Sequence, residues 1–393
     1  MQHFDVVIVG GGMAGATAAL AIKKTSPTLQ VAVIEAFAPK SQTHPSFDDR
    51  SIALADQSVQ YLKQFNLFNA DWPFAEAIKQ VHVSDRGHFG KTSLHHQDYK
   101  TNALGYVVEV NPFGAYLHQQ LAKTDIQLYC PATINELKQT QSSVELTLND
   151  ETQLSGKLLV VADGAQSPTR KQLNIGFDSL AYEQGALIAN IEVEGGHSGQ
   201  AFERFTEHGP MALLPMTQNR YSLVWCMPSV HLEHYKTLEP DAFISELQTA
   251  FGYRAGVFKQ VGMRAQYPLV LGRVEQLVHH RSLLIGNAAH AIHPIAGQGF
   301  NLGLRDIQAL VELIASKQHA LGEHAFTQAY NRARAQDIKM VMTLTDALVR
   351  LFSNSSRLMA LGRSCGLLAM SLSENLKAPL AKQLMGHVIK GKS

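Results

Sequence analysis

The chain has 393 residues, 45% of them hydrophobic, which is enough for two domains with large cores. Its 34 basic and 33 acidic residues give a formal net charge of +1, and no basic stripe is visible, so no nucleic-acid partner is expected. The three cysteines are far apart and the 18 histidines show no H-E-x-x-H spacing, so we expect no metal site and a reducing compartment.

The first element is a buried strand at Phe4–Val9 that runs into a glycine-rich turn. The turn matches G-x-G-x-x-G at three positions: Gly10, Gly12 and Gly15. An alanine-rich helix follows, and a second strand at Gln30–Ile34 ends at Glu35. This unit is the dinucleotide-binding fingerprint: the glycines admit a pyrophosphate to the helix N-terminus, and Glu35 accepts hydrogen bonds from the adenosine ribose.

The middle of the chain predicts two kinds of region. The elements up to residue 164 are a polar loop at 36–50, a helix at Ile52–Phe65, strands within 78–110, a helix at Pro112–Lys123, short strands at Ile126–Leu128 and Val144–Leu148, and a buried strand at Leu158–Ala162 that ends at Asp163-Gly164. From about 183 to 271 the pattern is antiparallel, with one helix at Pro240–Phe251. After residue 300 nearly all of the chain is predicted to be helical.

The segment 283–306 is the most informative stretch of the chain. An apolar run at Leu283–Ile285 ends at Gly286, and a loop with His293 and Pro294 leads through glycines into a helix. Three strand ends therefore carry glycine or acid: Val9/Gly10, Ala162/Asp163 and Ile285/Gly286. Because ligands of open parallel sheets bind at this edge, a long cofactor lying across the sheet would use all three ends, whereas a single NAD needs only the first.

These patterns predict an α/β fold with a nucleotide-binding domain in three separated pieces, an inserted, mainly antiparallel β domain and a C-terminal helical tail. The nucleotide-binding pieces are 1–71, 105–182 and 275–330. The inserted substrate domain takes 72–104 and 183–274, and the helical region takes 331–393.

Three elements resemble the class A flavoprotein aromatic hydroxylases, the para-hydroxybenzoate hydroxylase-like group, over nearly the whole chain. They are the N-terminal fingerprint, Asp163-Gly164-x-x-Ser167-x-x-Arg170, and Gly286-x-Ala288-Ala289-His290 with Pro294 and Gly297-Gln298-Gly299. Further stretches resemble the ubiquinone-biosynthesis hydroxylases of that group: Asp49–Leu54, Ala201–Thr206, Gly209-Pro210 and His293–Gly303. The resemblance implies a Rossmann-like FAD-binding domain with the substrate domain inserted into it.

The resemblance implies FAD, held tightly but not covalently, and NAD(P)H as a transient reductant. The implied cofactor-binding residues are Gly10, Gly12, Gly15, Glu35, Arg50, Asp163, Gly164, Gly286, Asn287 and Gly299. Alternatives stay open for three side chains: Arg50 could form a surface ion pair with Asp48 or Asp49, Asp163 could cap the next turn, and Arg170 could have a surface role.

Asn287 departs from the pattern of the group, which usually has an aspartate that accepts a hydrogen bond from a ribityl hydroxyl. An asparagine carbonyl oxygen also accepts, but without charge, so we expect FAD to bind less tightly.

The implied chemistry is hydroxylation of an electron-rich aromatic carbon through a C4a-hydroperoxyflavin formed from O2. The implied flavin neighbours are Pro215, Pro294, Gly297, Gln298 and Gly299, with a strand terminator as the alternative for Pro215. The helix that starts near Gly299 would point its N–H groups at the pyrimidine end of the reduced ring. His290 is the nearest titratable group, either as a base or as a structural histidine.

The implied substrate is a polyprenyl phenol, 2-polyprenyl-6-methoxyphenol. Alternatives are hydroxylation at another ring position, a polyprenyl reductase and a non-catalytic assembly subunit, whereas a halogenase is disfavoured because W-x-W-x-I-P is absent around Trp225. The start of the chain and the lack of an apolar run of ~18 residues predict a cytoplasmic protein.

The C-terminal tail carries apolar stretches at 340–351 and 358–372, followed by Lys377, Lys382, Lys390 and Lys392. It could lie on the inner membrane face or dock in a multienzyme complex. Packing on the FAD domain is the preferred interpretation for 340–351.

Overall fold

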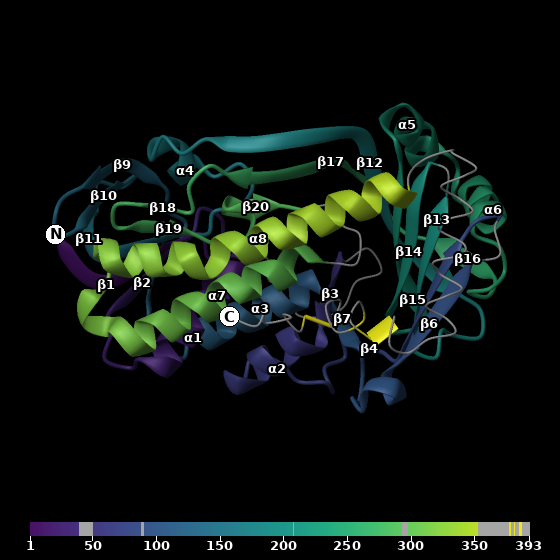
Figure 1. Ribbon diagram of the computed structural model, residues 1–393, viewed down its shortest axis with the longest axis horizontal. Helices are drawn as coiled ribbons and strands as arrows, with labels where there is room; N and C mark the ends of the chain where they lie inside the picture. The colour runs from purple at the N-terminus through teal and green to yellow at the C-terminus, as the bar shows by residue number, and fades with distance from the viewer. Residues whose placement is uncertain are drawn as a thin grey trace.

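Three β-sheets organise the protein, and helices cover their faces (Figure 1). The computed structural model describes residues 1–38, 50–87, 90–206, 208–292, 298–352, 377, 378, 381, 385 and 386, with the backbone alone for 181, 182 and 348–352. The predicted fold class is confirmed, since a mainly parallel sheet and a mainly antiparallel sheet are joined and two long helices follow residue 298.

The parallel sheet has the N-terminal strand at its centre. Its strands in spatial order are β18 (Val278–His279), β19 (Ser282–Leu284), β11 (Gln153–Val161), β1 (Gln2–Val9), β2 (Val31–Ile34) and β8 (Gln127–Tyr129), with β10 (Val144–Leu148) paired to β11 and β9 (Ile134–Gln139) paired to β10. The apolar run at the end of β1 suits this position, because a central parallel strand is covered on both faces. Helix α1 (Met13–Thr25) packs against α3 (Val110–Leu121) and α7 (Gln298–Lys317).

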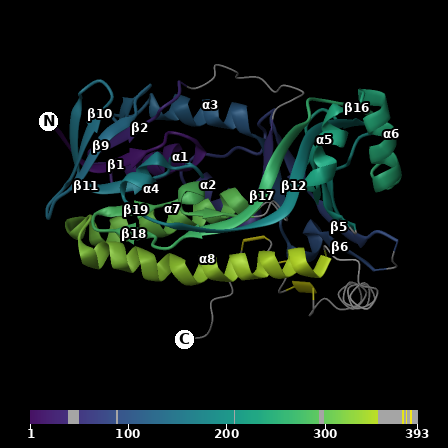
Figure 2. The same cartoon turned by 90° about the horizontal axis from the view of Figure 1, so that it is seen from above.

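The large antiparallel sheet forms the opposite end of the molecule. Its strands in spatial order are β20 (His290–Ala291), β17 (Ala265–Val274), β12 (Phe177–Val193), β15 (Arg220–Pro228), β14 (Gly209–Met216), β13 (Gln200–Thr206), β5 (Gln80–Asp85) and β6 (Lys91–His95), with β16 (Phe258–Val261) beside β12. One pair, β13 with β5, is parallel. Helices α5 (Ser229–Thr237) and α6 (Pro240–Phe251) lie on the face turned away from the parallel sheet (Figures 1 and 2). We call the other face the inner face.

The small sheet between the two corrects one prediction. It consists of β3 (Ser51–Ala55), β7 (Gly105–Glu109) and β4 (Ala75–Ile78). A helix predicted over the whole of Ile52–Phe65 is wrong for the first residues, because α2 begins only at Asp56 and ends at Gln64. The residues before it pair with β7 along their full length, and a local pattern does not reveal a partner so far along the chain.

Several short elements complete the chain, and the sequence patterns did not predict β9 or α5. The remaining elements are α4 (Pro168–Gln172) and the 3-10 turns η1 (His96–Tyr99), η2 (Gly286–Ala288) and η4 (Gln318–Ala320). The predicted domain boundaries stay predictions. One of them, at 182/183, falls inside β12, which runs without a break from Phe177 to Val193.

Helix α8 (His324–Phe352) runs along the length of the molecule and contacts both β18 and β14 (Figure 2). Val341 on its stripe is buried, which agrees with packing on the protein, whereas Met340 is exposed. Further on, Ala381 and Met385 are buried beside residues of the antiparallel and small sheets, and Lys377 is buried near Asp98. Lys382, Lys390, Lys392 and the stretch 358–372 lie outside the described residues. Within the described parts of the chain, none of the helices combines the length and apolar character needed to cross a bilayer.

A buried ion pair joins the large antiparallel sheet to the small one. Arg220 Nη2 lies 2.7 Å from Glu109 Oε1, and both side chains are 2% exposed. Replacing Arg220 by Met leaves the carboxylate of Glu109 buried without its cation. We expect the free energy of unfolding to fall by about 3–5 kcal/mol, measured by denaturant titration.

The double variant with Arg220→Met and Glu109→Leu is the control, because it removes both charges. It should recover part of that loss. A loss of less than about 1 kcal/mol in the single variant, the value of an exposed pair, would contradict the structural role given to this contact.

Candidate functional site

The three strand ends singled out by the sequence lie next to one another at the carboxyl edge of the parallel sheet. In the strand register, Val9 is opposite Val161, and Val161 is opposite Leu284. The chain leaves these positions through Gly10, Ala162 and Ile285, respectively. An elongated ligand lying across this edge would therefore meet all three turns.

The glycines of the first turn have two different roles. Gly10 has φ +98°, and an added Cβ there would lie 2.5 Å from the carbonyl oxygen of Ala162; an added Cβ at Gly15 would lie 1.8 Å from the carbonyl oxygen of Gly10. Both positions therefore require glycine for the turn itself. Gly12 differs, because no described residue lies within 4 Å of its Cβ position.

The open side of Gly12 faces the start of α1. Gly12 is the N-cap of this helix, no side chain caps it, and its first turn holds no acidic residue. Free N–H groups and the helix dipole make such a terminus a site for an anion, and a glycine there lets the anion approach the backbone. The turn thus fits a pyrophosphate.

Glu35 lies beside this turn, at the end of β2. One carboxylate oxygen accepts the N–H of Gly11, and the other accepts the N–H of Phe37 at 2.9 Å. These two bonds fix the side chain, and each oxygen keeps a further lone pair for a ligand hydroxyl. The position therefore suits a ribose diol.

The loop after β11 is held by its own side chains. Asp163 accepts a hydrogen bond from the hydroxyl of Ser167 and another from the N–H of Thr169 at 3.1 Å, while Ser167 caps α4 by accepting from the N–H of Arg170. The capping role left open for Asp163 is thus present. Gly164 has open space at its Cβ position, which leaves the backbone of this loop accessible.

Arg170 is buried, so a surface role for it is wrong. Its guanidinium donates to the carbonyl oxygens of Ala288 and Ala165, both at 2.9 Å, and stacks over Phe177. Burial lowers the pKa of Arg170, and the charge of Asp163 opposes that effect. Arg170 therefore ties the loop after β11 to the turn after β19, which sets the distance between two parts of the edge.

The third turn, which follows β19, is tightly packed against α7 at Gly286 and exposed at Asn287. The N–H of Gly286 donates to Asp306 Oδ2 at 2.9 Å, and an added Cβ at Gly303 would lie 3.2 Å from the Cα of Gly286. Asn287, the next residue, is exposed. Its side-chain amide is therefore accessible to a ligand at this edge.

His290 is not placed as a base for a substrate. Its side chain is fully buried, and Nε2 donates to Asp306 Oδ2 at 2.7 Å. Arg334 Nε donates to the other oxygen of Asp306, also at 2.7 Å. Burial raises the pKa of Asp306, but His290 and Arg334 outweigh it and lower the pKa overall. The structural alternative is therefore the one that the geometry supports.

The N-terminus of α7 brings two predicted residues to the edge. Helix α7 begins at Gln298, which is buried, and no described residue lies within 4 Å of the Cβ position of Gly299. His293, Pro294 and Gly297 lie outside the described residues.

Asn301 was missed as a functional residue. Its side chain accepts a hydrogen bond from the N–H of Ala55 and donates one to the carbonyl oxygen of Ala53, both at 2.8 Å, which fixes the start of α7 to β3.

One predicted cofactor-binding residue, Arg50, and one predicted flavin neighbour, Pro215, lie toward the antiparallel sheet. Arg50 is exposed, and its guanidinium donates to the hydroxyl of Tyr267 on β17 at 3.2 Å; Asp48 and Asp49 lie outside the described residues. Pro215 is buried in β14 and is followed by Met216, the last residue of that strand.

Glu203 lies on the inner face of the antiparallel sheet and was missed as a functional residue. Glu203 on β13 is half-buried, and burial raises its pKa to about 7. The strand pattern contains a signal for it, because alternation places Glu203 on one face together with Ala201 and Phe205.

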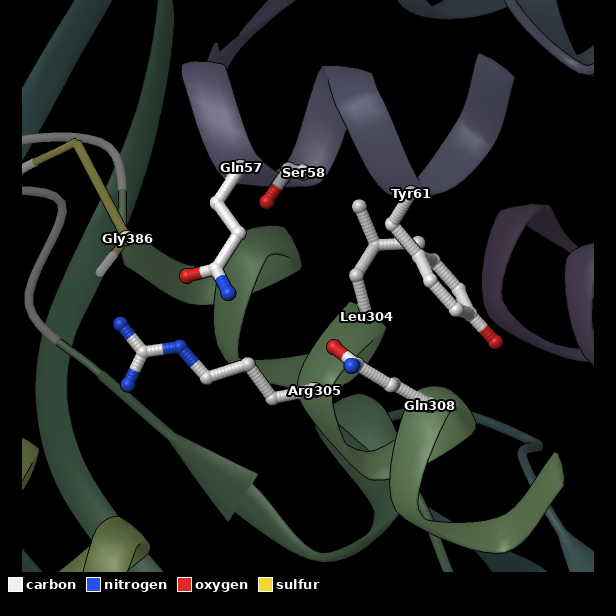
Figure 3. A pocket seen from close by; sticks show the side chains of 7 residues that line it. All are labelled: Gln57, Ser58, Tyr61, Leu304, Arg305, Gln308 and Gly386. Atoms are coloured by element: carbon white, nitrogen blue, oxygen red, sulfur yellow. The ribbon is translucent and has the colours of Figure 1, made fainter. Parts of the chain in front are cut away.

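A small pocket lies between α2 and α7 (Figure 3). The side chains of α2 and α7 face one another there, and Gly386 closes one side. Its lining residues are Gln57, Ser58, Tyr61, Leu304, Arg305, Gln308 and Gly386, and none of them was predicted to bind a cofactor.

Comparisons with known sequences point in the same direction as the geometry. The family described as FAD binding domain matches residues 3–345. The ubiquinone hydroxylase UbiL of Rhodospirillum rubrum is 35% identical over 387 residues, covering 97% of this chain and 89% of the relative. The 3-demethoxyubiquinol 3-hydroxylase of Escherichia coli is 29% identical, covering 98% and 99%.

Solved structures share the fold. The p-nitrophenol 4-monooxygenase PnpA from Pseudomonas putida DLL-E4 superposes with a TM-score of 0.79 at 16% identity, covering 100% of both chains. The flavin-dependent brominase Bmp2 gives 0.77 at 17% identity, covering 98% of this chain and 94% of the other. At these identities the likeness establishes the architecture.

The different surroundings of the glycines give a direct test of the cofactor turn. Gly12→Ala adds a methyl group to open space at an ordinary φ of −67°, so the melting temperature without cofactor should stay the same or rise slightly. The same methyl group occupies the space predicted for the pyrophosphate, so the Kd for FAD, from flavin fluorescence titration, should rise at least about tenfold, a loss of about 1.4 kcal/mol.

Gly15→Ala is the matched comparison, because its methyl group meets the backbone of Gly10 in the protein itself. This variant should lose thermal stability even without FAD. Unchanged FAD binding by Gly12→Ala would refute the assignment of the pyrophosphate to this turn.

Proposed function

Since the chain belongs to the FAD binding domain family, we propose that it is a FAD-dependent monooxygenase that hydroxylates a polyprenyl phenol of ubiquinone biosynthesis. The proposed substrate is 2-polyprenyl-6-methoxyphenol, with NAD(P)H and O2 as co-substrates. The observation that carries this proposal is the 35% identity to a ubiquinone hydroxylase over 97% of the chain.

The residues at the edge of the parallel sheet fit FAD. The pyrophosphate would lie against Gly12 and the start of α1, with Gly164 beside it, and the ribose of the adenosine half would bind Glu35. Asn287, exposed at the third turn, would accept a hydrogen bond from the ribityl chain. The open space at Gly12 and Gly164 supports this assignment, because side chains there would occupy the path of the cofactor.

The bound flavin supplies the oxidising chemistry: reduced by NAD(P)H, it activates O2 so that one oxygen atom enters the ring and the other becomes water. The protein contributes binding and charge. The start of α7 at Gln298 and Gly299 has no acidic residue in its first turn, so it favours negative charge on a ring placed there. The row of the inner face formed by Ala212, Val224 and Ile188 is apolar, so it suits a phenol with an apolar chain and limits access of water.

The enzyme assay tests this function. Purified protein with FAD should show flavin absorbance bands, and a short-chain 2-prenyl-6-methoxyphenol should speed consumption of both NAD(P)H and O2. Product analysis should then find one added oxygen atom. Continued NAD(P)H oxidation under argon with a polyprenyl substrate would instead identify a reductase, and flavin binding without any stimulation would favour an assembly subunit.

A peripheral membrane contact belongs to this proposal, because a polyprenyl phenol partitions into the bilayer. Vesicles with anionic lipids should carry the protein upward in a flotation gradient, and neutral vesicles should carry less. No flotation with either lipid would count against membrane contact and leave delivery of the substrate within a multienzyme complex, to be sought by co-purification.

A further inference from the structure

The carboxylate of Glu203 stands alone in an apolar part of the inner face. In the strand register it is opposite Ala212 on β14, which is opposite Val224 on β15, which in turn is opposite Ile188 on β12. All three neighbours are half-buried. The row thus forms an apolar wall with one acid in it.

The side chain of Glu203 points toward the part of the molecule that contains the parallel sheet, at whose carboxyl edge FAD is proposed to bind. The next residue back, Phe202, lies on the opposite face and packs against Phe251 of α6 with ring centroids 5.7 Å apart. Since successive side chains of a strand alternate, Glu203 lies on the face away from α6. Figure 1 shows the parallel sheet and α7 on that side.

No structural role accounts for this acid. Glu203 Oε1 is shielded from solvent, and among the described residues it has no hydrogen-bond partner and no cation forms an ion pair with the carboxylate. A carboxylate oxygen shielded in this way without a partner costs free energy, and perturbed acids of this kind concentrate at functional sites. The neighbouring thiol of Cys226 is no substitute partner, because burial and then the charge of Glu203 raise its pKa far above the usual range.

We propose that Glu203 binds the hydroxyl group of the phenol and takes its proton, acting as the catalytic base of the hydroxylation. This inference rests on the proposed function and gives the inner face a specific task. An apolar wall with one acceptor recognises a phenol ring with an apolar chain, since the ring needs one partner for its hydroxyl and none elsewhere.

The proton step balances within the proposed reaction. The phenol O–H bond breaks, the proton moves to the carboxylate of Glu203, and the electron pair stays on the phenolate oxygen, which enriches the ring carbon that receives the oxygen atom. When the ring loses its C–H proton to solvent and becomes aromatic again, Glu203 returns the first proton to the phenolate oxygen. O2 is the oxidant and NAD(P)H the reductant.

Catalysis provides the first test, with Glu203→Gln as the variant. Glutamine keeps the shape but accepts no proton, so kcat/KM for product should fall about 100-fold, the value of a general base. In the wild type this parameter should rise with pH along a limb centred near pH 7, where the carboxyl group ionises, and the limb should vanish in the variant. Glu203→Asp should restore part of the rate and the limb.

Glu194→Gln is the matched control, since Glu194 lies just beyond β12 and its side chain is 60% exposed beside Lys259. It should behave as the wild type. Other ionisable side chains that strand alternation puts on the inner face are Asp85, Glu192, Arg220, Cys226 and Tyr267, and Arg220 pairs with Glu109 of β7. Retention of the limb near pH 7 and of at least half of kcat/KM in Glu203→Gln would overturn the proposal.

A binding measurement separates this proposal from the proposed function. A short-chain 2-prenyl-6-methoxyphenol can donate its hydroxyl hydrogen, whereas its O-methyl ether cannot. Calorimetry at pH 8 should give the FAD-loaded wild type at least a tenfold preference for the phenol, and Glu203→Leu should lose it. That result would support Glu203 as the phenol acceptor even if no hydroxylated product formed, in which case the proposed function alone would fail. An equal preference in wild type and variant would refute the role of Glu203.

Misfolding should not obscure these tests. Because burial raises the folded-state pKa of Glu203 above its unfolded value, the ionised carboxyl destabilises the fold as pH rises from about 4.5 through about 7. Glu203→Gln removes that cost, so its melting temperature at pH 8.5 should equal or exceed that of the wild type, and the two should converge at pH 4. A lower melting temperature at pH 8.5 would show that the carboxylate stabilises the fold and would count against the proposal.

Discussion

The close contact between backbone atoms at Gly10 and Gly15 is the constraint on which the carboxyl edge of the parallel sheet depends. The carbonyl oxygen of Gly10 occupies the place where a side chain on Gly15 would begin, and Gly10 itself leaves no room before Ala162. As a result, β1, β11 and α1 come together at one point, with the helix N-terminus directed at the end of the strands. The space left at Gly12 is a product of that packing, so the shape of the binding site is fixed before any ligand arrives.

A second group of contacts, made by buried charged side chains, fixes the remaining turns at the carboxyl edge of the parallel sheet. Asp306 receives hydrogen bonds from the turn at Gly286, from His290 and from Arg334, and Arg170 joins the turn after β19 to the loop after β11. All of these side chains are buried. Paired in this way, buried charges are expensive to separate, so they hold α7, α8 and two turns in a single arrangement. The role of His290 is therefore structural: it helps to hold the turns at this edge in place.

The sequence predicted the elements that are contiguous in the chain, but not the contacts between residues that are far apart in it. The fingerprint from Phe4 to Glu35 is contiguous, and its strand, turn and helix could all be predicted from spacing and hydrophobic pattern. By contrast, Asn301 meets Ala55, 246 positions away, and the neighbours of Glu203 follow from the register of three strands that no local pattern specifies. The same limit explains why β3 was predicted as part of a helix: its pairing with β7 decides its conformation.

Continuous secondary structure, and not flexible linkers, connects the two large sheets. The long strand β12 runs into the antiparallel sheet without a break, and α8 touches both ends of the molecule. The gap between Gly299 and the inner face is therefore set by hydrogen-bonded structure. In the proposed function the aromatic ring and the flavin meet in this gap, so the entropy of aligning them would be lost once, during folding, instead of at every turnover.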